Sequence, residues 1–258
     1  MINYWANFTK YRPLLKELVI TDIKLKYRRS VLGIVWSVLQ PLLMMIVLTL
    51  VFSNLFKSDI PYFPVYVLTG RIIWDLYYQG SASPMGAIVA NASLIKKVYV
   101  PKYIFPLARC LSSLVNTAFS MVALFVVMLA VGVDITPICL LIPIPIFYVF
   151  LFATGVGLLL SSYNVFFRDI SYLYEVFTTA WMYFTPLFYP PNVLPEKYQF
   201  IFDFNPLYYM VTFFRDIVMY QTFPGVKENL ICLGIGVISF VVGLYTFYKK
   251  QDKFILYV

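Results

Sequence analysis

Histidine is absent from this chain of 258 residues, and cysteine is scarce. The lack of histidine excludes His-based catalytic triads, His-ligated metals and His proton relays. The three cysteines, Cys110, Cys139 and Cys232, stand alone in apolar stretches without CxxC spacing, so neither a structural zinc site nor redox chemistry is expected. We interpret them as small apolar packing residues.

Charge is also scarce, since Asp, Glu, Lys and Arg together make up 12% of the chain, against roughly 25% in a soluble domain. Hydrophobic residues make up 61%. A soluble globule of this length could not bury so much apolar surface, whereas a bilayer removes the need to bury it. The composition therefore predicts an all-α polytopic membrane protein with one transmembrane domain over residues 1–258.

The apolar runs predict six transmembrane helices, because a span needs about 20 apolar residues. Before them, residues 1–30 are expected to form a cytoplasmic interface helix, in which Pro13–Tyr27 is amphipathic with Pro13 in its first turn. No cleaved signal peptide is expected, because no apolar core precedes residue 31. The expected spans are residues 31–56, 62–90, 109–131, 138–163 and 172–189, which all lie in 31–189, and then 229–248.

The segment 190–226 is apolar and aromatic, yet proline interrupts it repeatedly. Its apolar runs are too short to span, so it is expected to form short re-entrant helices, at 198–202 and 204–214, that enter the outer leaflet and return. Residues 249–258 are expected to form a cytoplasmic tail.

The basic residues predict the orientation. With both termini inside, 14 of the 20 Lys and Arg residues fall in inner segments. Only Lys57, Lys197, Arg215 and Lys227 fall in outer segments. This bias follows the positive-inside rule. The net charge of +8 is thereby explained without nucleic-acid binding.

Motifs for catalysis are missing. The chain has no DxD, HxxxH or GxSxG motif and no phosphate-binding glycine loop, so it is expected to be neither an enzyme nor itself a nucleotide-binding protein. Arg71 and Asp75, spaced i,i+4 inside the second span, are expected to pair. Ion-coupled transport remains open only through Asp75 and Glu175. No cofactor or metal is expected on this chain.

Aromatic residues are abundant, with 24 Phe, 22 Tyr and 4 Trp. Interface belts and core packing explain many of them. The alternative is a conduit whose rings stack on sugars. The hypothetical lining residues are Trp36, Trp74, Tyr77, Trp181, Tyr183 and Phe188.

A basic cluster precedes the first span. Lys26, Arg28 and Arg29 either anchor the chain on anionic lipid or bind the phosphate of a lipid headgroup. The sequence leaves both interpretations open.

Four segments carry a resemblance to a known family. They are YRRSVLGIVWSVLQP (27–41), NASLIKKVYVPKYIFP (91–106), NVFFRDI (164–170) and FNPLYYMVTFFRD (204–216). The chain resembles the membrane-spanning permease subunits of bacterial ABC transporters that export polysaccharides such as O antigen, capsule or teichoic-acid-type polymers. The resemblance covers nearly the whole chain.

The resemblance implies a homodimer of permeases in the bacterial inner membrane, bound to two cytoplasmic ATPase subunits that hold ATP and Mg. It assigns ATPase contact to the interface helix and the first inner loop, and an outer gate to residues 191–220. The implied coupling residues are Asn91, Ser93, Lys96, Lys97 and Tyr99. The implied gate residues are Asn205, Pro206, Tyr208, Arg215 and Asp216.

The function expected from this resemblance is export of lipid-linked polysaccharide, with O antigen as the first expectation. Two alternatives stay open at this point. One is an exporter of drugs or small lipids with the same architecture, and the other is a membrane-embedded enzyme of glycolipid synthesis.

Overall fold

The computed structural model describes residues 4–55 and 60–257, which form helices and no strands. Phe56, the last residue of the first expected span, and Lys57 lie outside the described residues. The prediction of an all-α chain is confirmed for the described part.

Within residues 4–55 and 60–257, four helical segments are long and apolar enough to cross a membrane, which makes the chain a polytopic membrane protein. The buried share of these segments ranges from 6% in the first to 50% in the third. In chain order they are η1 and α2 (Gly33–Val35 and Trp36–Leu55), α6 (Ile104–Val131), η2 and α7 (Pro137–Leu141 and Pro143–Asn164), and α11 with η5 (Val226–Lys250 and Gln251–Leu256).

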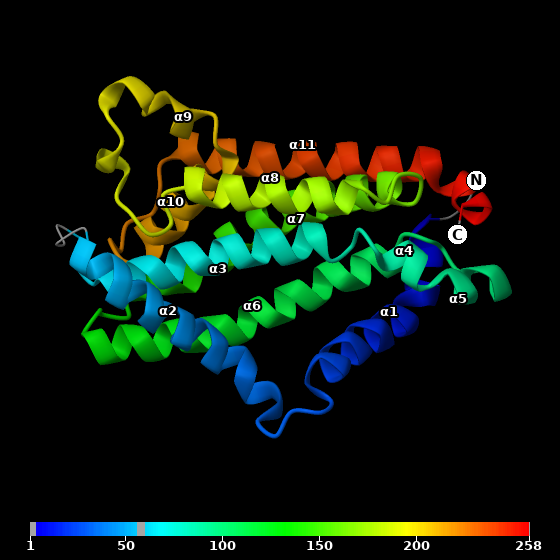
Figure 1. The fold of residues 1–258 in the computed structure, drawn as a ribbon, viewed down its shortest axis with the longest axis horizontal. Coiled ribbons are helices and arrows are strands. Elements are labelled where there is room, and N and C mark those ends of the chain that lie inside the picture. The colour runs from blue at the N-terminus through cyan, green and yellow to red at the C-terminus, as the bar shows by residue number, and fades with distance from the viewer. Residues whose placement is uncertain (1–3, 56–59, 258) are drawn as a thin grey trace.

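Two further helices, α3 (Phe63–Ala82) and α8 (Ile170–Phe184), run alongside these (Figure 1). The α3 helix lies at the centre of the bundle, where it packs against α2, α6, α7, α8 and α10. The α8 helix ends at Phe184, and the chain from Thr185 to Pro190 is not helical. The fifth expected span is therefore a short helix followed by a non-helical segment with bends.

The N-terminal helix α1 (Tyr4–Tyr27) lies within the expected range of residues 1–30, but it begins before Pro13, which lies inside it rather than in its first turn. The prediction that a helix begins at Pro13 was therefore wrong. Leu15 is 6% exposed and packs in a cluster with residues of α6. The apolar face of α1 thus contacts the protein itself.

Short helices cap the two ends of the bundle (Figure 1). At the end where α1 begins and η5 ends lie α4 (Ala87–Ala90) and α5 (Ala92–Lys97). At the opposite end lie η3 (Pro191–Val193), η4 (Glu196–Tyr198), α9 (Phe200–Asp203) and α10 (Pro206–Val218).

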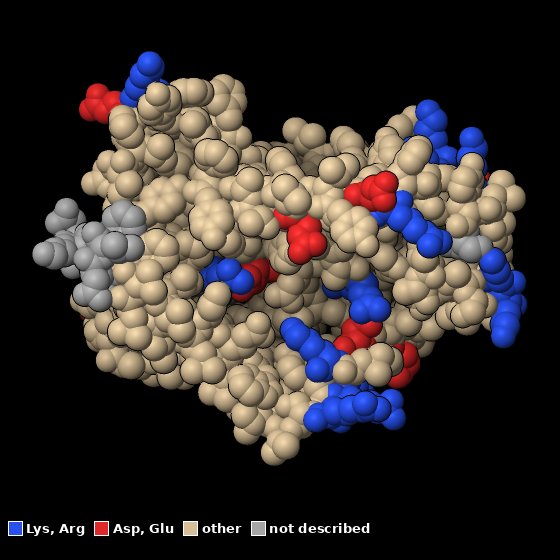
Figure 2. Space-filling model, in the orientation of Figure 1, with Lys and Arg blue, Asp and Glu red and all other residues tan. Residues whose placement is uncertain are grey.

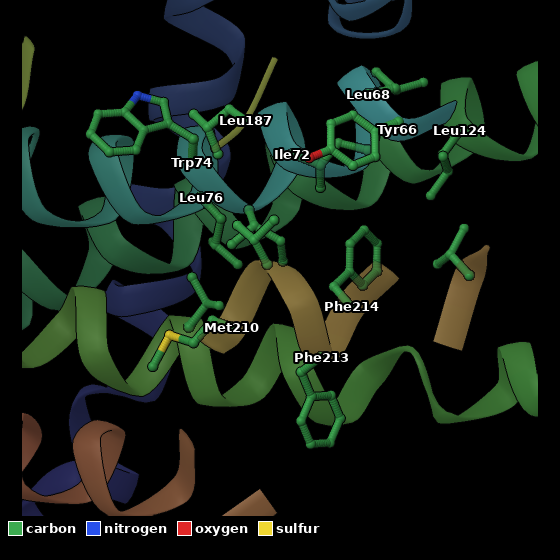
Figure 3. Packing of buried hydrophobic residues seen from close by; sticks show 14 of the residues in the cluster. Tyr66, Leu68, Ile72, Trp74, Leu76, Leu124, Leu187, Met210, Phe213 and Phe214 are labelled. Atoms are coloured by element: carbon green, nitrogen blue, oxygen red, sulfur yellow. The ribbon is translucent and has the colours of Figure 1, made fainter. Parts of the chain in front are cut away.

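The main core lies between α3, α7 and α10. Figure 3 shows Ile72 and Leu76 of α3 facing the side of α10 that carries Met210 and Phe214. Phe213 and Phe214 are 1% and 0% exposed. Because α10 is buried so deeply, this helix is part of the folded bundle and not a surface appendage.

The helices α7 and α11 pack backbone to backbone. A methyl group added to Gly243 would overlap the carbonyl of Gly155, and one added to Gly155 would overlap the backbone of Ser239. Small residues permit such close approach of helices in membrane proteins.

Candidate functional site

A polar cleft opens between the end of α1 and the helices α2, α3 and α6. We call the part that Trp36 and Arg71 line the upper part, and it is a cavity of about 290 Å³. The polar residues that line this part are Lys26, Ser37, Gln40, Arg71, Asp75, Gln79, Asn116 and Ser120, and Trp36 adds an aromatic wall.

Two rows of polar residues form this cleft, each with i,i+4 spacing. Arg71, Asp75 and Gln79 follow one another on α3, and Asn116 and Ser120 on α6. Asn116 Nδ2 donates a hydrogen bond to Gln79 Oε1 at 3.4 Å, so the rows meet. Gln79 and Asn116 were not predicted from the sequence, although this spacing within apolar helices was a usable signal.

The predicted pair of Arg71 and Asp75 is confirmed, since Arg71 Nε lies 3.0 Å from Asp75 Oδ2. The two side chains keep 24% and 30% of their surface exposed. Charges inside a bundle usually face a cavity or a partner. The pair therefore presents charge to the cleft and is not sealed in the core.

The lower part of the cleft, about 310 Å³, shares Lys26, Gln79 and Asn116 with the upper part. Here Arg109 Nη1 lies 3.1 Å from Asp22 Oδ1, and Ser112 Oγ donates to Asp22 Oδ2 at 3.3 Å. Burial raises the pKa of Asp22, while Arg109 and Ser112 oppose that rise. These contacts fasten α1 to α6.

The three predicted headgroup residues fall in different places. Lys26 lines both parts of the cleft. Arg28 and Arg29 are exposed in the turn between α1 and α2 and do not line it.

The six aromatic residues of the hypothetical conduit do not form one lining within this chain. Trp74, Tyr77 and Phe188 are buried in the core. Trp181 packs edge-on against Tyr77, with ring centroids 5.2 Å apart. Of the other two, Trp36 is 39% exposed at the cleft and Tyr183 is 62% exposed.

Two of the predicted gate residues tie the outer helices to the end of α8, and we call this pair the outer latch. Asn205 Oδ1 accepts hydrogen bonds from Leu207 N at 3.1 Å and Trp181 Nε1 at 3.0 Å, and its Nδ2 donates to Thr185 Oγ1 at 2.9 Å. Asn205 thereby caps α10 and positions the non-helical chain after α8.

Arg215, the second latch residue, is 5% exposed. Its guanidinium donates to the carbonyl oxygens of Pro186, Leu187 and Tyr66 at 2.9 to 3.1 Å and stacks 3.4 Å from the Tyr66 ring centroid. The arginine thus joins α10, α3 and the segment after α8.

The other predicted gate residues lie on α10. Pro206 is its first residue, and Tyr208 stacks on Phe202 of α9 with ring centroids 5.1 Å apart. Burial and the nearby Glu228 raise the pKa of Asp216 to about 6.

The predicted coupling segment lies at the opposite end of the bundle. Ile95 and Val100 are buried and anchor it, while Ser93, Lys96, Lys97 and Tyr99 are exposed. Asn91 donates to Ala87 O at 2.8 Å and so fixes the junction between α4 and α5.

Chemically, the cleft offers hydrogen-bond donors, acceptors and two ion pairs, Arg71 with Asp75 and Arg109 with Asp22, but no catalytic cluster. In residues 4–55 and 60–257 no group of three His, Cys, Asp or Glu side chains gathers that could hold a metal. Because Pro41, Leu43, Met44 and Val47 of α2 also line the cleft, the arrangement suits a ligand with both polar and apolar parts.

The chain matches the ABC-2 type transporter family over residues 13–219 and belongs to it. It is therefore a transport subunit of a membrane transporter and not an enzyme. It is 29% identical over 244 residues to an O-antigen export system permease protein RfbA of Klebsiella pneumoniae, covering 93% of each chain.

Two further relatives extend this comparison. An O-antigen export system permease protein RfbA of Myxococcus xanthus is 25% identical over 98% of each chain. The capsule polysaccharide export inner-membrane protein CtrC of Neisseria meningitidis serogroup B is 23% identical over 91% of this chain and 92% of its own.

Proposed function

We propose that this chain is the permease of an exporter that moves lipid-linked polysaccharide, O antigen in the first instance, across the cytoplasmic membrane. The observation that carries this proposal is the likeness over nearly the full length to proteins named for O-antigen and capsule export. A likeness over the full length includes the cleft, both bundle ends and all the long helices.

The proposed topology has six spans with both termini cytoplasmic. The spans are the four long apolar helices together with α3 and α8. Two facts support this orientation. The first and last described helices lie at one end of the bundle (Figure 1), and most of the Lys and Arg atoms visible in Figure 2 lie in that half.

The proposed assembly is a homodimer bound to two ATPase subunits, which supply ATP and Mg. The exposed residues Ser93, Lys96, Lys97 and Tyr99 present a contact surface beyond the ends of the long helices, and α1 lies beside it. Because Asp22 and Arg109 join α1 to α6, a displacement of α1 would also move the α6 residues that line the polar cleft.

The proposed path of the substrate begins at the cleft. Lys26 at its mouth suits a lipid-linked phosphate, and the row Arg71, Asp75, Gln79 offers hydrogen bonds to sugar hydroxyls. Trp36 can stack on a sugar ring there. The outer latch, with Tyr183 exposed beside it, would hold the outer end closed until it is released.

The decisive experiment combines co-purification with glycan analysis. The tagged chain is co-expressed with the ATPase encoded beside it, and stoichiometry and ATP hydrolysis are measured. In parallel, the gene is deleted and surface polysaccharide is compared with lipid-linked glycan retained inside the cell.

A complex of two permeases and two ATPases, with lipid-linked glycan accumulating inside the deletion strain, is the expected result. An ATPase complex with normal surface polysaccharide in the deletion strain would shift the substrate to drugs or small lipids. A chain that turns over a sugar nucleotide without an ATPase would overturn the proposal.

The role of the cleft has its own test. Gln79→Leu combined with Asn116→Leu should lower export at least several-fold while the complex with the ATPase still forms, because the change removes polar groups only from the cleft. Unchanged export from a stable double variant would remove the cleft from the substrate path.

A further inference from the structure

A second pocket lies away from the polar cleft, where the inner end of α7 meets the inner end of α11. We call it the tail pocket. Its volume is about 740 Å³, more than twice that of either part of the cleft. Its lining residues are Tyr163, Phe166, Phe167, Tyr245, Thr246, Lys249, Lys250, Lys253 and Tyr257.

Three of these residues are lysines that the fold gathers at one place. Lys249 and Lys250 end α11, and Lys253 lies on η5. Neither of the ion pairs found in the described part of the chain includes any of the three, and Asp252 beside them is exposed. Three lysines beside one acid leave the pocket with a net positive charge.

Aromatic rings hold this arrangement in place. Lys250 Nζ lies 3.6 Å from the centroid of the Tyr163 ring. Phe254 is fully buried, with its ring centroid 5.2 Å from that of Phe247, and it anchors η5 against α11. Tyr257 packs edge-on against Phe166 at 4.8 Å. The lysines are thus placed on a packed frame, not on a loose tail.

An exposed apolar stripe leads away from the pocket along α11. Ile238, Val241 and Tyr245 are 67%, 57% and 66% exposed, and their i, i+3, i+7 spacing puts them on one helix face. The next position on this face, Lys249, lines the pocket. A surface that is apolar along the span and cationic at its end is complementary to an anionic phospholipid, which has apolar acyl chains and a negative headgroup.

We propose that the tail pocket binds the phosphate of an anionic glycerophospholipid, with an acyl chain lying along the apolar stripe of α11. Basic pockets between helices on the cytoplasmic side bind such headgroups. A cytoplasmic protein would reach the lysines but not Ile238 and Val241, which lie more than two turns into the span. The stripe therefore favours a lipid over a protein partner.

The test is native mass spectrometry of the purified complex, with phosphatidylglycerol, cardiolipin or phosphatidylcholine of matched acyl chains added in turn. The wild type should retain the anionic lipids and not phosphatidylcholine. The variant Lys249→Gln/Lys250→Gln/Lys253→Gln should bind the anionic lipids at least about tenfold more weakly.

Two further variants separate the pocket from general surface charge. Lys10→Gln/Lys16→Gln/Lys24→Gln removes three exposed lysines of α1, which line no part of this pocket, and should leave retention of the anionic lipids unchanged. The variant Lys249→Arg/Lys250→Arg/Lys253→Arg keeps the positive charge and should therefore still bind the anionic lipids. Retained binding would show that the glutamine variant loses binding through its lost charge and not through substitution as such.

Equal losses in the two glutamine variants would overturn the proposal, since charge alone would then explain retention. Loss of the ATPase subunit from the tail-pocket variant with lipid retention intact would also overturn it and identify a protein contact. Displacement of the lipid by inorganic phosphate alone would show that the acyl stripe contributes nothing.

Discussion

Single polar residues decide how this largely apolar chain is held together. The pairing of Arg71 with Asp75 could be predicted from their i,i+4 spacing, because a helix fixes which residues share a face. The partners of Arg215 could not be predicted. They are backbone carbonyls at positions 66, 186 and 187, which only the tertiary fold brings together.

The first prediction at this scale concerns Asn205. Asn205→Ala should destabilise the protein by about 1–2 kcal/mol, because it removes the cap of α10 and the bonds to Trp181 and Thr185. Thermal unfolding in detergent measures the change. Asn192→Ala, at an exposed outer position, is the matched control. Equal stability of the two variants would contradict the latch.

The second concerns Asp216, whose pKa is raised to about 6 by burial and by Glu228. An acid with a raised folded-state pKa stabilises the fold below its unfolded pKa, near 4, and loses that contribution as pH rises through 6. Because Asp216 is only half-buried, we expect a loss of about 1 kcal/mol between pH 4 and 7.

Asp216→Asn should flatten this part of the stability profile, measured by unfolding across that pH range. Asp203→Asn, at an exposed acid of the same outer region, is the control and should retain the wild-type slope. An unchanged slope in Asp216→Asn would refute the assignment.

At the scale of elements, the existence of the long helices followed from their apolar runs, but several ends did not. Pro13 lies inside α1 although it removes a helical hydrogen bond, and residues on both sides of it, Tyr11 and Leu15, pack in the cluster that includes residues of α6. The end of α8 at Phe184 has a local signal in Pro186, which disfavours helical backbone at Thr185, but the course of the following chain depends on hydrogen bonds from Asn205 and Arg215. Local signals do not contain such distant partners.

The closest helix contact gives a prediction of its own. Gly243→Ala should lower the unfolding temperature by several degrees, because the new methyl group overlaps Gly155 and forces α7 and α11 apart. Gly234→Ala on the same helix meets no atom within 4 Å and should be neutral or slightly stabilising. Similar behaviour of both variants would argue against the backbone contact.

At the scale of the whole molecule, composition was enough to predict a polytopic helical protein, since no soluble core could hold its apolar surface. The cleft and the burial of the aromatic residues were harder to predict from the sequence. The cleft depends on Gln79 and Asn116 meeting across two helices, and three of the six aromatic residues expected to line a conduit are core residues. Sequence alone does not tell a ring in a core from one in a pore.

The proposed orientation predicts opposite labelling of two introduced cysteines. The native cysteines are buried and should stay unreactive. In intact cells whose outer membrane has been made permeable, an impermeant maleimide should label Lys197→Cys, whereas Lys97→Cys should react only after the inner membrane is opened. Both replaced lysines are exposed. The reverse pattern would invert the topology.

The hydrogen bonds of Arg215 go to main-chain oxygens, and the ring on which it stacks, that of Tyr66, lies on α3 outside the loop between α8 and α10. A carbonyl oxygen is chemically the same whichever residue carries it, so these three bonds place no demand on the identity of the side chains at their far ends. One fixed arginine is therefore compatible with many sequences in the loop between α8 and α10. Libraries that randomise the exposed positions of residues 191–204 can search for altered transport while keeping the anchoring point of the outer helices intact.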